Sequence, residues 1–110
     1  MARDDYFVIS YKLLKYLYDC LKRGMPPNTE VLNSDFFSIK EEYWQYILRT
    51  LHDDGYIGGI LMNALLGGKP YATRIDQAEI TPKGIFYLDE NSVFKKIKGT
   101  VKDIADMIPL

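Results

Sequence analysis

Apolar residues recur with helical spacing along the first segment of the chain. Between residues 5 and 23 they follow one another at intervals of three and four, which places them on one face of a helix. Acidic residues precede the segment, basic residues close it, and Gly24 follows as a C-cap. We therefore predict a helix over residues 5–23. Its apolar face consists of Phe7, Tyr11, Leu14, Leu17, Tyr18 and Leu21.

The same helix carries a second apolar stripe, and the end of the chain carries another. A surface helix needs only one apolar face, so we expect the first helix to be central or covered. Residues 92–108 have an amphipathic pattern that predicts a C-terminal helix. The two stripes are expected to pack on each other, either within one chain or across the two-fold axis of a homodimer. They comprise Ile9, Leu13, Tyr16 and Cys20 in the first helix, and Phe94, Ile97, Val101, Ile104 and Ile108 in the last.

The middle of the chain predicts a short element and then a capped helix. A proline pair ends the first helix, because proline cannot continue one. Residues 29–37 are expected to form a short helix or turn. Ser38 and Glu41 have the spacing of a capping box, in which each side chain bonds the other residue's backbone N–H. The helix that follows is predicted over residues 39–54, and it ends at Gly55.

A hairpin and a further helix complete the predicted elements. Residues 56–80 contain β-branched and apolar residues on both sides of a Gly-Gly-Lys-Pro break at 67–70, which predicts a β-hairpin with an irregular tip. Thr81 is a favourable N-cap and Pro82 suits the first helical position, so we predict a helix over residues 82–90.

The order of these elements indicates a fold. A helix-turn-helix followed directly by a two-stranded hairpin is the winged-helix arrangement, in which the hairpin is the wing. The predicted fold is therefore a single α+β domain over residues 1–110. It is a winged helix-turn-helix with a β-hairpin wing and an additional C-terminal helix.

Three segments of the chain also carry a family resemblance. They are DYFVISYKLLKYLYDCLKRG (residues 5–24), IKEEYWQYILRTLHDDGYI (residues 39–57) and ITPKGIFYLDENSVFKK (residues 80–96). With these motifs the chain resembles the YjcQ-like family, small proteins of Gram-positive bacteria and their phages. The resemblance implies a winged-helix fold and an unassigned, DNA-related role. It carries no catalytic signature and supplies no site residues.

Charge and composition narrow the classes of function. The 110 residues include 14 basic and 15 acidic side chains, which argues against a protein that binds polyanions through bulk charge. One cysteine and one histidine leave no intrachain disulfide and no evident nucleophile–base pair. We therefore expect a protein that is not an enzyme and has no cofactor or metal. Without a secretory signal or a long apolar run, the chain is expected to be cytoplasmic.

Four side chains are candidates for contact with double-stranded DNA. Gln45 and Arg49 fall on the exposed face of the predicted third helix, where glutamine suits adenine and arginine suits guanine. Lys69 and Arg74 lie on or near the wing, where phosphate contact is expected. The first hypothesis is accordingly a non-enzymatic winged-helix DNA-binding or regulatory protein.

The charge of the third-helix region supports an alternative. Residues 28–55 contain two basic and six acidic residues, and an acidic face repels phosphates. The alternative is a winged-helix module that binds another protein and no DNA. It would use the acidic third-helix face or the apolar residues of the wing, which are Ile60, Leu61, Met62, Leu65 and Leu66.

Overall fold

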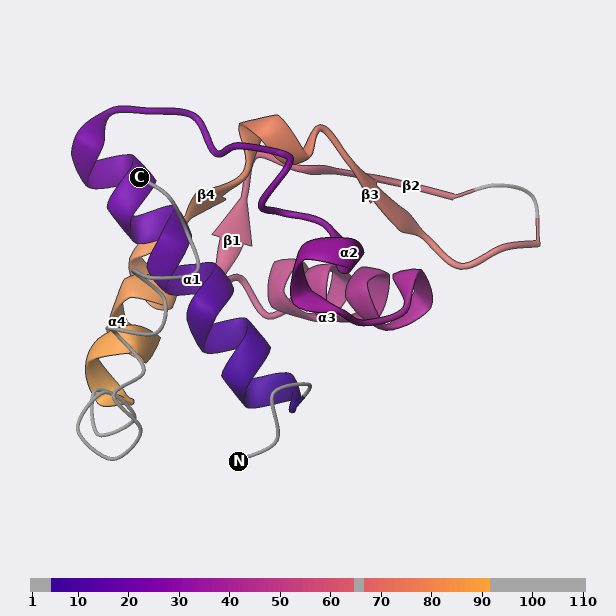
Figure 1. The fold of residues 1–110 in the computed structure, drawn as a ribbon, viewed down its shortest axis with the longest axis horizontal. Coiled ribbons are helices and arrows are strands. Elements are labelled where there is room, and N and C mark those ends of the chain that lie inside the picture. Colours follow the sequence, from indigo (N-terminus) through magenta and orange to yellow (C-terminus); the bar gives the residue numbers. More distant parts are fainter. Residues whose placement is uncertain (1–4, 65–66, 92–110) are drawn as a thin grey trace.

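The computed structural model describes residues 5–64 and 67–91, which form helices and two small antiparallel strand pairs of the α+β class. The predicted helix over 92–108 lies outside the described residues. Figure 1 shows α1 crossing α4, and a β2–β3 hairpin that projects beyond α3 away from both. The elements are α1 (Tyr6–Arg23), α2 (Ser34–Phe37), α3 (Glu41–Asp53), β1 (Ile57–Gly58), β2 (Leu61–Asn63), β3 (Tyr71–Thr73), the 3-10 turn η1 (Ile75–Gln77), β4 (Glu79–Ile80) and α4 (Pro82–Glu90).

Helix α1 begins and ends where its capping residues place it. The Asp5 side chain accepts a hydrogen bond of 2.8 Å from the Phe7 N–H, which satisfies one of the N–H groups that the first turn leaves unpaired. At the other end Gly24 adopts a left-handed conformation with φ of 67°, a region that glycine enters at low cost. The observed bounds differ from the predicted 5–23 by one residue at the N-terminal end.

The second apolar face of α1 is buried, and so is the middle of the first face, which makes α1 the central helix. Phe7 and Leu21, which we predicted on the first face, are instead 56% and 48% exposed at its two ends. The loop after α1 covers part of the second stripe, because the Tyr16 hydroxyl accepts a hydrogen bond of 2.8 Å from the Asn28 N–H. Val31 and Leu32 of this loop are buried as well. The sequence suggested only the C-terminal stripe as a cover for this face. The second stripe comprises Ile9, Leu13, Tyr16 and Cys20, none more than 5% exposed.

The predicted capping box at the start of α3 is wrong. Ser38 has a φ of 58° and ends α2 as its C-cap, while Lys40 is the N-cap of α3 and makes no side-chain capping bond. The Glu41 carboxylate instead accepts a hydrogen bond of 2.9 Å from the Ser34 hydroxyl. The reason is that Asn33 caps α2 by accepting from the Phe36 N–H, so a separate helical turn fills part of the predicted 29–37 segment and α3 starts later.

The hairpin is divided into two strand pairs. Ile57 pairs with Ile80 at the base, and Met62 pairs with Ala72 farther out. Between them Gly59 has a φ of 82°, and η1 interrupts the returning strand, so the hairpin predicted over 56–80 is interrupted at this level as well as at its tip.

The apolar wing surface also needs correction. Ile60, which we expected to be exposed, is only 7% exposed and belongs to the core. Leu61 is 49% exposed, as a surface position requires, and Met62 is partly buried against the core. Leu65 and Leu66 lie outside the described residues. Over the residues of the hairpin that the structure describes, the exposed apolar area is therefore smaller than the sequence indicated.

Helix α4 is joined to the end of α3 by polar contacts. The Thr81 hydroxyl accepts from the Gly84 N–H as an N-cap and donates to the Gly55 carbonyl at 2.6 Å. The Lys83 ammonium donates to the Asp54 carbonyl at 2.7 Å. These bonds fix the turn that leads from α3 into the strands.

Candidate binding groove between α3 and the hairpin

A groove of about 650 Å³ lies between α3 and the segment that enters β3. It forms because α3 buries one face in the core and leaves the opposite face beside the hairpin. The groove contains three of the four residues predicted to contact DNA, Gln45, Arg49 and Lys69, while Arg74 is not among the residues that line it. The other lining residues are Glu41, Glu42, Tyr43, Tyr46, Pro70 and Tyr71.

The Gln45 side chain joins α3 to the edge of the hairpin. Its Oε1 accepts a hydrogen bond of 2.7 Å from the Ala72 N–H, a group on the edge of β3 that faces α3. Its Nε2 donates to the Glu41 carboxylate at 3.0 Å. An exposed strand edge needs such a cover, and a buried amide N–H is costly without a partner. Both ends of the amide that we expected to contact bases are therefore engaged within the fold.

Replacing Gln45 by alanine tests this structural role. The Gln45→Ala variant leaves the N–H of Ala72 without its acceptor, and Ala72 is only 6% exposed. We expect the free energy of unfolding to fall by about 1–3 kcal/mol, measured by urea denaturation. Gln77→Ala is the matched control, because Gln77 is exposed and its side chain bonds only Asp76 beside it. Equal stability of the two variants would contradict the role of Gln45.

Aromatic side chains gather next to the groove on the exposed side of α3. The Arg49 guanidinium lies 5.5 Å from the centre of the Tyr46 ring. The Tyr46 ring in turn contacts Tyr6 edge-on, and Tyr6 contacts Phe7 in the same way. Tyr46 is 48% exposed and Phe7 is 56% exposed, so much of this apolar area faces solvent. We call Tyr6, Phe7 and Tyr46, together with Arg49, the aromatic cluster.

Sequence reasoning missed the aromatic cluster. Tyr46 stands off the apolar stripe of its own helix, and it precedes Arg49 by three residues, a spacing that puts the two side chains side by side. Tyr71, which is 37% exposed, faces the groove from the strand side. The spacing of Tyr46 and Arg49 was the available signal, whereas the approach of Tyr71 depends on the fold.

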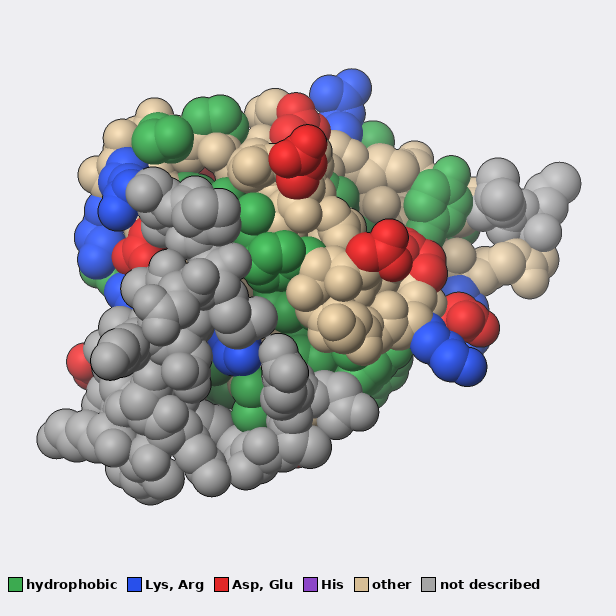
Figure 2. Space-filling view, viewed as in Figure 1, with side chains coloured by type: hydrophobic (Ala, Val, Ile, Leu, Met, Phe, Trp, Pro, Cys, Tyr) green, Lys and Arg blue, Asp and Glu red, His purple; other side chains and the backbone are tan. Residues whose placement is uncertain are grey.

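The charges of the groove are mixed. Arg49 and Lys69 line it together with the carboxylates of Glu41 and Glu42. On the face drawn in Figure 2, basic and acidic side chains stand next to one another at the hairpin end of the molecule. A duplex gains affinity from several lysines or arginines on phosphates, so this balance gives little general attraction for nucleic acid.

Two further properties bear on the chemistry of the described residues. In the ranges 5–64 and 67–91, no three His, Cys, Asp or Glu side chains come together in a way that would hold a metal ion. No helix in these ranges has the length and apolar character needed to cross a membrane.

Comparison with known proteins gives a family match over most of the chain. The family model described as YjcQ protein matches residues 11–107. A curated relative from Bacillus subtilis (strain 168), described as "Uncharacterized protein YjcQ", is 30% identical over 94 residues. The match covers 86% of this chain and 95% of the relative. No solved structure matches the chain.

Proposed function

The chain belongs to the YjcQ protein family, and we propose a function for it from the chain's own surface. The chain is a non-enzymatic winged-helix module that binds a segment of a protein partner in the groove between α3 and the hairpin. The order of helices, with the hairpin directly after α3, supports the winged-helix assignment.

The observation that carries the proposal is the pairing of exposed tyrosines with an arginine. Tyr46 and Tyr71 face the groove from opposite sides, and Arg49 lies over the Tyr46 ring. Tyrosine and arginine are enriched among the few residues that carry most of the binding energy of protein interfaces, because they combine large contact area with directed polar groups. The expected partner segment places an apolar or aromatic side chain between the tyrosines and a carboxylate near Arg49 and Lys69.

The state of the single cysteine supports a non-enzymatic role. Cys20 is 5% exposed, and burial raises the pKa of its thiol above the ordinary value. A raised pKa keeps the thiol protonated at neutral pH, and the thiolate is the form that acts as a nucleophile. Cys20 therefore fits a packing role beside Tyr16.

Site-specific photo-cross-linking tests the proposal. A photoreactive phenylalanine analogue at Tyr71 reports on the groove, and the same analogue at Phe86 serves as the matched control, since Phe86 is 63% exposed on α4. We expect the analogue at position 71 to form a covalent adduct of defined mass with the partner protein. This adduct should be absent with the analogue at position 86, and it should be lost when Arg49→Ala is added. Adducts that are the same at both positions, or that persist without Arg49, would refute the proposal.

Binding to double-stranded DNA is the second candidate, and one observation favours it. Arg49 and Lys69 are far apart in sequence but line the same groove, as a pair of phosphate contacts would. If DNA is the ligand, Arg49→Ala and Lys69→Ala each weaken binding to a mixed duplex and each lower the salt slope by about 1. Fluorescence anisotropy at several salt concentrations measures both effects.

The control for DNA binding is a lysine outside the groove. Lys83→Ala should leave affinity and salt slope unchanged, because Lys83 lies at the base of α4 and donates to the Asp54 carbonyl. Absence of any binding to mixed duplex at low salt would exclude DNA and leave the protein partner as the remaining candidate.

A further inference from the structure

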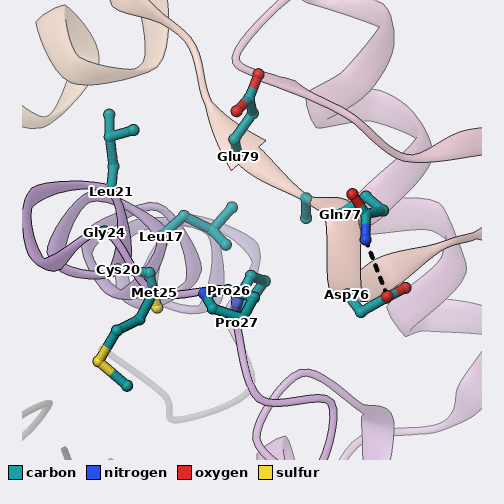
Figure 3. Close-up of a pocket in the computed structure, with 11 residues that line it drawn as sticks. Leu17, Cys20, Leu21, Gly24, Met25, Pro26, Pro27, Asp76, Gln77 and Glu79 are labelled. Carbon is teal, nitrogen blue, oxygen red and sulfur yellow. Dashed lines mark hydrogen bonds between the residues drawn. The ribbon is translucent and has the colours of Figure 1, made fainter.

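A second hollow, separate from the groove, lies between the end of α1 and the returning strand. It has a volume of about 280 Å³ and shares no lining residue with the groove. Figure 3 shows apolar side chains of α1 and the proline loop on one wall, including Leu17, Leu21 and Met25, and polar side chains of η1 and β4 on the other. Asp76 and Glu79 supply the carboxylates of that polar wall. We call this hollow the acidic cleft.

The exposed groups of the acidic cleft are of two complementary kinds. Leu21 is 48% exposed and Met25 is 56% exposed, so the apolar wall presents large side chains to solvent. Among residues 5–64 and 67–91, the ion pairs involve other acids, and the Asp76 carboxylate accepts only from the neutral Gln77 amide. A ligand with apolar side chains flanked by cations would pack on the apolar wall and pair with the carboxylates of the polar wall.

We propose that residues 93–102 of the same chain bind in the acidic cleft. This segment lies outside the described residues, but its sequence has the required composition. It contains apolar residues at the helical spacing of three and four, four lysines, and no acidic residue. Its apolar residues are Phe94, Ile97 and Val101 with Val93, and its lysines are Lys95, Lys96, Lys98 and Lys102.

The chain is long enough to place this segment in the cleft of its own molecule. Leu88 and Asp89 of α4 line a small pocket together with Tyr18 and Lys22 of α1, so α4 ends beside the C-terminal half of α1. The six residues after Asn91 span up to about 20 Å when extended. This length is several times the rise of one turn of α1, which is about 5.4 Å. The segment can therefore extend from the end of α4 to the acidic cleft at the end of α1.

A spin-label experiment on the full chain tests the proposal. In a Cys20→Ser background, a nitroxide on Met25→Cys sits on the apolar wall of the acidic cleft. We expect the amide resonances of residues 94–98 to lose most of their intensity relative to the same sample with the nitroxide reduced. A nitroxide on Lys69→Cys is the matched control, because Lys69 lies on the exposed hairpin loop and Figure 1 places that loop at the far end from α1's last turn.

Charge reversal and mixing complete the test. Asp76→Lys combined with Glu79→Lys should restore the intensity of residues 94–98, whereas Asp53→Lys with Asp54→Lys should leave the loss in place. Rising salt in the unreversed protein should also restore intensity, since exposed charges are screened. Unchanged intensity with the Met25 label, resistance to both charge reversal and salt, or a loss seen only when labelled and isotope-enriched copies are mixed would each overturn the proposal.

Discussion

Replacing Trp44 by alanine is expected to lower the free energy of unfolding by about 3–5 kcal/mol. Trp44 is 2% exposed on the buried face of α3, and its ring stacks on Phe37 of α2 with centroids 5.4 Å apart. Truncation removes the largest side chain between the two helices and leaves a cavity. Because Trp44 is the only tryptophan, denaturation should be followed by circular dichroism and not by fluorescence.

A second aromatic on the same helix provides the control for Trp44→Ala. Tyr46 is 48% exposed, so Tyr46→Ala removes little buried area and should cost under about 1 kcal/mol. If the two variants were equally stable, α3 would not be held by its contact with α2. Tyr46→Ala should instead weaken partner binding in the groove. The two variants therefore distinguish a residue that stabilises α3 from a residue of α3 that contacts the partner.

The parts of the fold that the sequence predicted are those in which local chemistry determines the structure. Gly24 can take a left-handed conformation, and Thr81 with Pro82 suits the start of a helix wherever the rest of the chain lies. Such signals gave the ends of α1 and the start of α4 to within a residue. The start of α3 was misplaced because Ser38 ends α2 with a φ of 58°, a conformation that is uncommon for serine and that no local signal in the sequence indicates.

The candidate site depended more on contacts between distant segments. The helical face of Arg49 was evident from spacing, but the bond from the Ala72 N–H to Gln45 joins residues 27 apart in sequence. Periodicity assigned Gln45 to the surface, and no local pattern shows that a strand edge will reach it. The division of the hairpin likewise follows from a close approach between Gly59 and η1 that the alternation of apolar residues does not encode.

Replacing Gly59 by alanine is expected to cost about 2–5 kcal/mol. Gly59 has a φ of 82°, where a side chain is strained, and a Cβ there would overlap the backbone carbonyl of Gln77. Backbone cannot rotate away as the end of a side chain can, so η1 and β4 must shift. Gly24→Ala is the matched control, since Gly24 also has positive φ but open space around it, and only the smaller strain of about 1–2 kcal/mol should appear.

Hydrogen exchange at the edge of the groove distinguishes a displacement of the hairpin from a general loss of stability in Gly59→Ala. Gly59 directly follows β1, where the hairpin leaves the β1–β4 strand pair. A shift at Gly59 therefore moves β3 relative to α3 and lengthens the hydrogen bond from the Ala72 N–H to Gln45. We expect hydrogen exchange at the Ala72 amide to accelerate more in Gly59→Ala than in Gly24→Ala at matched fractions of unfolded protein. Equal acceleration in both variants would mean that the hairpin keeps its place against α3 without the close packing at Gly59, and that Gln45 alone sets the width of the groove.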